Sequence, residues 1–279
     1  MRVDELDLND NHEEQSENLK ETYTEESYAI NREMRKKKRN ASVKRKHIFL
    51  KTFLVLFCLV GVLLTPVFSI KSISVSGNSY LSKEQIIDAS GISKNSNIFI
   101  FQTKKAVDGL EELSFVDVAE VKRVFPSGVS ISIKECKPVA QVACGQSLFL
   151  VIDETGKILD TADNSEKYKV TLINNVTIDE FEVGKKIKVE DTATFEKLLL
   201  LSQEIVKNSM SEVVSDIYSK NTDLYVTLNT GVRCNLGNSS NLSYRVKFIN
   251  EVYKSIPKEK KGRLEFVEEY KAVFTEDEE

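Results

Sequence analysis

One uncharged run, from Thr52 to Ile70, limits what this chain can fold into more than any other feature of its sequence. Together with the four residues before it, the run reaches the roughly 20 residues that an α-helix needs to cross a bilayer. A buried core helix would be shorter or amphipathic. A cleaved signal peptide would not follow 47 residues of chain, and no small-x-small exit is present. We therefore predict one transmembrane helix over residues 48–70.

The charges on the two sides of this run predict its orientation. Nine basic residues against Glu33 alone stand between Arg32 and Lys46, directly before the run. By the positive-inside rule the amino-terminal tail is cytoplasmic and the carboxyl terminus faces out. Residues 1–47 are too polar to bury a core, so we expect a disordered tail. From Lys71 onward acids slightly outnumber bases, which argues against nucleic-acid binding.

A first small domain is predicted over residues 71–140, in the order strand, helix, helix, strand, strand. Ser82 and Gln85 form a capping box that starts the first helix, and Gly91 ends it. The expected elements are a strand at 70–76, helices from about 83 and from about 103, the latter with Val107, Leu110 and Leu113 on one face, and strands 115–124 and 129–133 joined across 125–128.

A second, larger domain of mixed strands and helices is predicted over residues 141–274, followed by an acidic tail at 275–279. The expected elements are a hairpin turning at 153–156, a helix capped by Asp191 or Thr192 with Phe195, Leu198, Leu199, Ile205 and Val206 inward, two strands joined at 229–231, a helix from about Leu242 that stops at Pro257, and a final strand from Leu264 to Phe274. The fold class is therefore α+β.

The cysteines give a limited signal. Cys234 shares one face of its predicted strand with Val232 and Leu236, so we expect a core thiol. Whether Cys136 and Cys144 form a disulfide stays open, because three cysteines after the span cannot complete a disulfide framework.

Residues that carry chemistry are scarce after the predicted span. Both histidines, His12 and His47, precede it, which leaves no imidazole for a catalytic triad or a histidine metal site. No glycine-rich phosphate loop is present. The acid pairs 153–154 and 179–180 are the candidates for a glycan hydrolase, but both stand in turn-like polar stretches where acids are usually solvated. We expect no enzyme, no catalytic residue, no cofactor and no metal.

Several short motifs, in a fixed order after one span, resemble those of a known family. They are 73–78 (ISVSGN), 91–99, 121–126 (VKRVFP), 135–140 (ECKPVA), 151–156 (VIDETG), 232–237 (VRCNLG) and 264–266 (LEF). The sequence resembles the FtsQ/DivIB family of cell division proteins, in the DivIB form of Gram-positive bacteria. Cys136 departs from the arginine usual at that position. The first domain is similar to the family's POTRA domain, and the second to its β domain.

The resemblance implies a non-enzymatic component of the divisome, in the cell membrane at the division septum. It would scaffold partners of the DivIC/FtsB and FtsL types, near septal penicillin-binding proteins, and support septal peptidoglycan synthesis. The implied partner-binding residues lie on the last strand: Phe266, Tyr270, Lys271, Ala272, Val273 and Phe274. Two alternatives stay open, namely a POTRA-bearing envelope assembly or secretion factor and a membrane-anchored cell-wall hydrolase.

Overall fold

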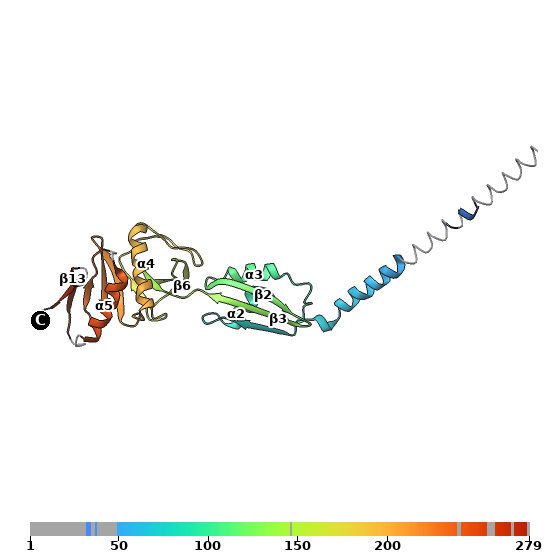
Figure 1. Cartoon of the computed structure of the whole chain (residues 1–279), viewed down its shortest axis with the longest axis horizontal. Helices are drawn as coiled ribbons and strands as arrows, with labels where there is room; N and C mark the ends of the chain where they lie inside the picture. The colour runs from blue at the N-terminus through green and yellow to red at the C-terminus, as the bar shows by residue number, and fades with distance from the viewer. Residues whose placement is uncertain are drawn as a thin grey trace, which may run out of the picture. The chain divides into compact units, whose positions relative to one another are not determined.

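The computed structural model describes residues 32–34, 37, 49–145, 147–238, 241–255, 260–268 and 271–277 (Figure 1). The chain divides into two units, Met1–Pro66 and Val67–Glu279. Most of the predicted cytoplasmic tail and part of the acidic tail lie outside the described residues.

In the first unit, residues 49–63 form a helix whose large apolar side chains are exposed. This helix ends earlier than the predicted span, since the turn of 3₁₀-helix η1 (Pro66–Phe68) follows and Pro66 has no N–H to continue the helical bonding. Ile70 lies instead in the core of the second unit. Among the residues described, no helix combines the length and the apolarity required to span a membrane.

The second unit begins with a three-stranded sheet in the order β1-β3-β2, and β1 runs parallel to β3. We call this part the three-stranded domain. Its elements are β1 (Ser72–Ser76), α2 (Lys83–Ser90), α3 (Thr103–Glu111), β2 (Val116–Val124) and β3 (Gly128–Glu135). The predicted order of strand, helix, helix, strand, strand is confirmed.

Local sequence signals explain the turns of this domain. Ser82 accepts a hydrogen bond from the Gln85 N–H while the Gln85 side chain accepts one from the Ser82 N–H, so the capping box is confirmed. Gly91 ends the helix at φ 64°. Position 77 requires glycine for two reasons: its φ is 87°, and a Cβ there would lie 1.9 Å from the Ile133 carbonyl oxygen.

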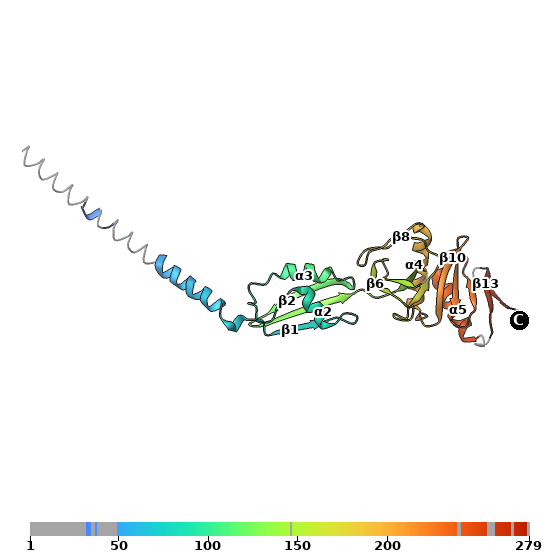
Figure 2. The same ribbon diagram turned by 180° about the vertical axis from the view of Figure 1, so that it is seen from behind.

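The remainder of the second unit is built on a nine-stranded sheet in the order β14-β13-β12-β11-β10-β7-β4-β5-β6, which we call the nine-stranded domain (Figures 1 and 2). Its strands are β4 (Ala140–Cys144), β5 (Leu148–Ile152), β6 (Ile158–Ala162), β7 (Thr171–Ile173), β10 (Val214–Lys220), β11 (Asp223–Leu228), β12 (Arg233–Asn235), β13 (Gly262–Glu268) and β14 (Lys271–Glu276), and a separate small ribbon joins β8 (Ile178–Glu180) to β9 (Lys188–Val189).

Two helices, α4 (Thr192–Lys207) and α5 (Leu242–Ser255), contribute to the core of this domain. Asp191 caps α4 as predicted, since its carboxylate accepts from the Thr194 N–H at 3.0 Å. Leu198 and Ile205 are buried, but Val206 is exposed, so its predicted inward position is wrong. The 3.6-residue period places Leu201 rather than Val206 on the buried stripe.

The carboxyl-terminal run differs most from the prediction. The expected single strand from Leu264 to Phe274 is instead the antiparallel hairpin of β13 and β14, with Leu264 opposite Phe274 and Phe266 opposite Ala272. A period of two cannot distinguish one long strand from two strands whose turn is polar, because both satisfy the alternation. Ile256 and Pro257, where α5 was predicted to stop, lie outside the described residues.

Candidate partner-binding edge

The hairpin of β13 and β14 forms one end of the nine-stranded sheet. β13 pairs in parallel with β12, so the core side of the sheet continues into the hairpin. Leu264 is buried, and Phe266, Ala272 and Phe274 pack half-buried against the same core. The face of the hairpin toward α5 therefore packs in the core. The outer edge of β14 is the part of the hairpin that is left for a partner to contact.

Backbone geometry identifies the groups that this edge presents. The Asp277 N–H donates to the Lys261 carbonyl, which makes the two residues a hydrogen-bonded pair of the antiparallel ladder. In such a ladder the bonded pairs alternate, so Thr275 and Val273 also turn their backbone groups toward β13. The N–H and C=O groups of Ala272, Phe274 and Glu276 point away from the sheet, and no partner strand pairs with β14 on that side within the described residues.

Helix α5 supports the hairpin from the core side. The Phe248 ring stands edge-on to Phe266 with centroids 5.3 Å apart, and the Arg245 guanidinium lies 5.1 Å from the centre of the Phe266 ring. Arg245 also donates to the Leu236 carbonyl. These contacts fix the inner face of β13, so the edge is presented by a packed element.

Ion pairs hold the register at the open end of the hairpin. Asp277 accepts from Arg233 at 3.2 Å and lies 3.7 Å from Arg263, while Lys260 pairs with Glu276 at 2.8 Å. Each pair is solvent-exposed and contributes on the order of 0–1 kcal/mol. Together they join β12, β13 and β14 at one end.

The predicted site residues separate into three groups. Phe266, Ala272 and Phe274 lie half-buried on the inner face, so they stabilise the hairpin as well as flank its edge. Lys271, paired with Glu268 at 2.9 Å, and Val273, 50% exposed, lie on the outside. Tyr270 lies outside the described residues.

A polar face next to the hairpin was missed at the sequence level. The rings of Tyr218 and Tyr225 stack with centroids 5.1 Å apart on β10 and β11, and a shallow hollow beside them is also lined by Asn235, Arg263 and Glu265. Tyr218 and Tyr225 are opposite one another in the register of the two strands. That pairing was the available signal, since residues directly opposite on one face bring their side chains together.

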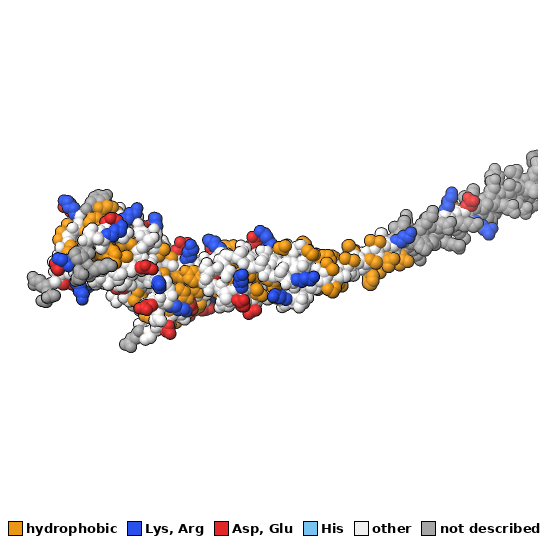
Figure 3. All heavy atoms as spheres, turned by 90° about the horizontal axis from the view of Figure 1, so that it is seen from below, with side chains coloured by type: hydrophobic (Ala, Val, Ile, Leu, Met, Phe, Trp, Pro, Cys, Tyr) orange, Lys and Arg blue, Asp and Glu red, His pale blue; other side chains and the backbone are white. Residues whose placement is uncertain are grey.

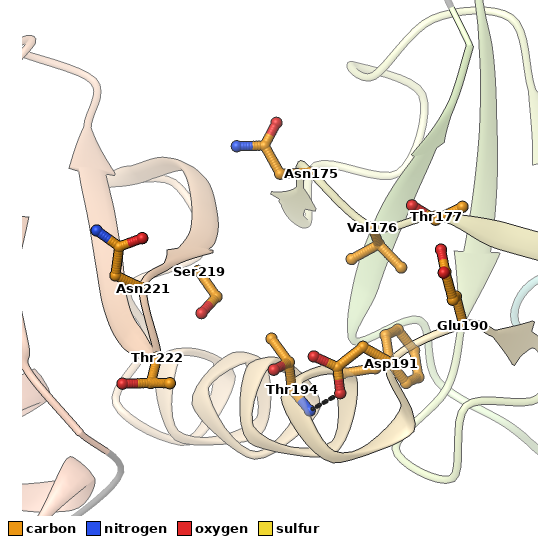
Figure 4. A pocket seen from close by; sticks show the side chains of 10 residues that line it. Asn175, Val176, Thr177, Glu190, Asp191, Thr194, Ser219, Asn221 and Thr222 are labelled. Atoms are coloured by element: carbon orange, nitrogen blue, oxygen red, sulfur yellow. Dashed lines mark hydrogen bonds between the residues drawn. The ribbon is translucent and has the colours of Figure 1, made fainter.

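A second hollow lies at the amino-terminal end of α4, where Asn175, Thr194, Ser219 and Asn221 surround it (Figure 4). Its acids are Glu190 and Asp191, and the hydrogen bond with Thr194 holds the pKa of Asp191 below its usual range. That carboxylate is engaged in capping the helix. The lining contains no Lys or His beside these two acids.

The acid pairs weighed for catalysis have different surroundings. Asp153 is only 5% exposed, which corrects its expected solvation, and its Oδ1 accepts from the Thr155 N–H, the Thr155 hydroxyl and the Lys157 N–H. It holds the β5–β6 turn together. Asp179 and Glu180 are exposed, and the hydrogen bond from Lys188 lowers the pKa of Glu180.

The structure also shows where the cysteines and the possible metal ligands lie. Burial raises the pKa of Cys234 to about 12, as a core thiol requires, so that prediction is confirmed. Cys136 and Cys144 are free thiols. In the described part of the chain, no group of three or more His, Cys, Asp or Glu side chains is placed to hold a metal ion.

Comparison with known proteins agrees with this architecture. A family model of the FtsQ-type POTRA domain matches residues 68–135, which contain the three-stranded domain. Cell division protein DivIB of Clostridium botulinum strain Hall is 25% identical over 242 residues, covering 83% of this chain and 93% of that protein. DivIB of Clostridium acetobutylicum is 27% identical over 184 residues, covering 60% and 73%, and DivIB of Bacillus subtilis is 27% identical over 189 residues, covering 67% and 64%.

The class follows from the fold and the domain match: this is a POTRA-domain protein with a larger α+β sheet domain after it. Its relatives extend over both domains rather than the POTRA domain alone. Residues 68–135 match the FtsQ-type POTRA domain, and the chain is similar over much of its length to proteins named cell division protein DivIB, in agreement with the resemblance that its motifs indicated.

Proposed function

We propose that this chain acts in cell division as a membrane-anchored scaffold, and that the outer edge of β14 receives a strand of a partner protein. The relatives that match it are named cell division proteins, which supports the division role. The observation that carries the binding proposal is the row of outward backbone groups on Ala272, Phe274 and Glu276. A partner strand can pair with them directly, as in other cases of β-augmentation.

The anchor is the apolar run that begins at residue 48 and ends before Pro66, with the amino terminus in the cytoplasm and the carboxyl terminus outside. Its support is the uncharged run, the basic block before it and the apolar side chains exposed along the helix at 49–63. Transfer of such side chains from water into lipid is favourable, at about 0.8 kcal/mol for each buried CH₂. In this proposal the POTRA domain and the nine-stranded domain lie outside the cell membrane, at the division septum.

The partners proposed are bitopic division proteins of the DivIC/FtsB and FtsL types. Gathering them close to septal penicillin-binding proteins would support septal peptidoglycan synthesis without a reaction of the chain's own. Strand addition gives affinity through main-chain bonds, and specificity comes from neighbouring side chains. Lys271, Val273 and Glu265 flank the edge on the open face and could set the register of the incoming strand.

Two proline substitutions on neighbouring residues test the edge. Ala272→Pro removes an N–H that points outward and leaves the pairing with β13 intact, which edge strands tolerate. The affinity of the full chain, in detergent, for a purified DivIC-type protein should fall about tenfold or more. A tenfold loss corresponds to about 1.4 kcal/mol of binding free energy. Unfolding of the chain should change little.

Val273→Pro is the matched control, because its N–H faces β13. It should lower the free energy of unfolding by about 1–3 kcal/mol, since a buried backbone bond is lost. Undiminished capture by a folded Ala272→Pro chain would overturn the edge proposal, whatever the control does.

The topology has its own test. A cysteine placed at Ser16 should resist impermeant thiol reagents in intact cells, and one at exposed Ser255 on α5 should react, in a chain whose native cysteines are replaced. The basic block motivates this expectation. The opposite labelling pattern would contradict the proposed orientation.

A further inference from the structure

One end of the three-stranded domain carries an apolar surface that the partner edge does not account for. We call it the basal patch and define it as Val67, Phe99, Ile100, Val124 and Phe125. All five side chains are exposed, Phe99 by 42%, Ile100 by 68% and Phe125 by 59%. Figure 3 shows hydrophobic side chains gathered at the surface toward the amino-terminal end of this domain.

Three segments far apart in the sequence build this patch. The Ile98 N–H donates to the Phe68 carbonyl at 2.9 Å, and the Ile70 N–H donates to Ser96 at 2.8 Å. The Lys71 N–H donates to the Ser127 carbonyl at 2.8 Å, which adds the β2–β3 turn. The patch is therefore a fixed product of the fold.

Phe68, half-buried beside the patch, forms a connected row with the patch rings Phe99 and Phe125. The centroids of Phe68 and Phe99 lie 5.2 Å apart, and those of Phe99 and Phe125 lie 5.4 Å apart. Arg123 holds the loop beneath them, since its guanidinium donates to the carbonyls of Ile98 and Phe101 at 2.8 Å each. Phe99 and Phe125 are the exposed rings of this row, and contiguous exposed apolar surface often marks an interaction site.

The three chain segments that carry the patch contain basic residues and no acids. No Asp or Glu occurs within 64–83, 92–107 or 121–134, the three segments that contain the patch. The basic residues in those segments include Lys71, Lys83, Lys94, Lys104, Lys105 and Arg123, while Lys122 pairs with Glu120 at 2.7 Å and Lys134 with Asp117 at 2.6 Å. Aromatic and aliphatic side chains bordered by lysines are typical of surfaces that lie in the headgroup region of a membrane.

The sequence position of the patch limits what can cover it. Phe68 follows the last residues of the proposed membrane anchor, and four extended residues reach at most about 14 Å. The patch is thus tethered within that distance of Leu64, close to the polar layer of the bilayer. This step rests on the proposed anchor.

We propose that the basal patch lies in the headgroup region of the outer leaflet, with Phe125 and Ile100 in the lipid interface and the neighbouring lysines on anionic headgroups. The three-stranded domain is then held on the membrane by a second contact besides its anchor. Such a contact limits the tilt of the domain relative to the bilayer.

The chain contains no tryptophan, so one introduced indole reports on one position. The full chain is reconstituted into phosphatidylcholine vesicles, with and without phosphatidylglycerol and with brominated acyl chains. The tryptophan fluorescence of Phe125→Trp should be blue-shifted, and brominated lipid should quench it strongly. Val118→Trp is the matched control, because Val118 is similarly exposed at 53% and lies about six residues, roughly 20 Å, along β2 from Val124.

Further variants separate the possible failures. Leu56→Trp lies within the proposed anchor and should be quenched strongly. Quenching of Leu56→Trp without quenching of Phe125→Trp would overturn the basal contact and leave the anchor standing. An unquenched Leu56→Trp would overturn both.

Two outcomes address the identity of the occupant. Quenching of Phe125→Trp should be greater with phosphatidylglycerol, and Lys71→Gln together with Lys94→Gln should reduce that difference. Short-wavelength emission from Phe125→Trp that brominated lipid leaves unchanged would mean that protein covers the patch, and it would overturn the proposal.

Discussion

The two edges of the nine-stranded sheet differ in whether their outward backbone groups have hydrogen-bond partners. β6 ends the sheet on one side, and the backbone of its first residue is satisfied, since the Ile158 N–H donates to Lys185 at 2.9 Å and the Gly184 N–H donates to the Ile158 carbonyl at 2.7 Å. Ser114 donates to the Leu159 carbonyl. β14 ends the sheet on the other side with its outward groups unpaired by any described strand. An open sheet edge carries a risk of aggregation, and proteins usually cover it. An open β14 edge in a sheet whose opposite edge is covered therefore supports the proposed binding role.

Side chains reinforce the difference. Beside β6, Asp160 accepts from Lys167 and from the Tyr168 hydroxyl, and the Tyr168 ring stacks on Phe115 with centroids 6.3 Å apart. Beside β14, Val273 and Lys271 stand exposed. The covered edge is thus attached to surrounding structure, and the open edge is free to accept a strand.

The largest expected effect tests whether both edges are equally folded. Ile158→Ala and Leu264→Ala each remove a buried side chain next to an edge, and each should lower stability by about 2–5 kcal/mol. Hydrogen exchange of the β5–β6 and β13–β14 amides in the full chain measures the local loss. A negligible change from Leu264→Ala would mean that the hairpin is ordered only with a partner, and the comparison would then fail.

A smaller effect concerns the covered edge and depends on pH. Burial tends to raise the pKa of Asp160, but hydrogen bonds from Lys167 and Tyr168 outweigh it, so the pKa lies below its ordinary value of 3.8. A group with a depressed folded pKa contributes stability above its unfolded pKa and loses it as pH falls through the folded value. Asp160→Asn should therefore cost about 1 kcal/mol at neutral pH.

That cost should shrink as the pH falls below 3.8, where the wild-type carboxylate protonates. Chemical denaturation of both chains across that range gives the difference directly. Lys134→Met, which removes the exposed pair with Asp117, is a control whose cost should be smaller at neutral pH. A cost of Asp160→Asn that stays constant down to strong acid would contradict the proposed cause.

The smallest effect is expected for the exposed side chain of the open edge. Val273→Thr keeps β-branching and should change the free energy of unfolding by less than about 0.5 kcal/mol. Because the proposed affinity comes from main-chain bonds, capture of the DivIC-type protein should fall far less than with Ala272→Pro. Equal losses for the two variants would show that side chains, rather than the strand edge, carry the binding.

Much of the local structure could be predicted from short patterns. The capping box at Ser82, the Asp191 cap, the turn at 153–156 and the buried Cys234 follow from chemistry within a few residues. The errors occurred where one pattern fits two structures. The run from Leu264 to Phe274 alternates equally well as one strand or as a hairpin, and only pairing with β12 selects the hairpin.

The sequence by itself determined the elements of the three-stranded domain and their order, the family resemblance and the prediction of one anchor, because periodicity, caps and uncharged length are local properties of the chain. Only the tertiary structure decided which sheet edge stays open, since β6 is covered by residues 184 and 185 and by Ser114. It alone also brought Phe99 and Phe125 together in the basal patch, beside Phe68. Both features depend on contacts between distant residues, and no window of sequence contains the two sides of such a contact.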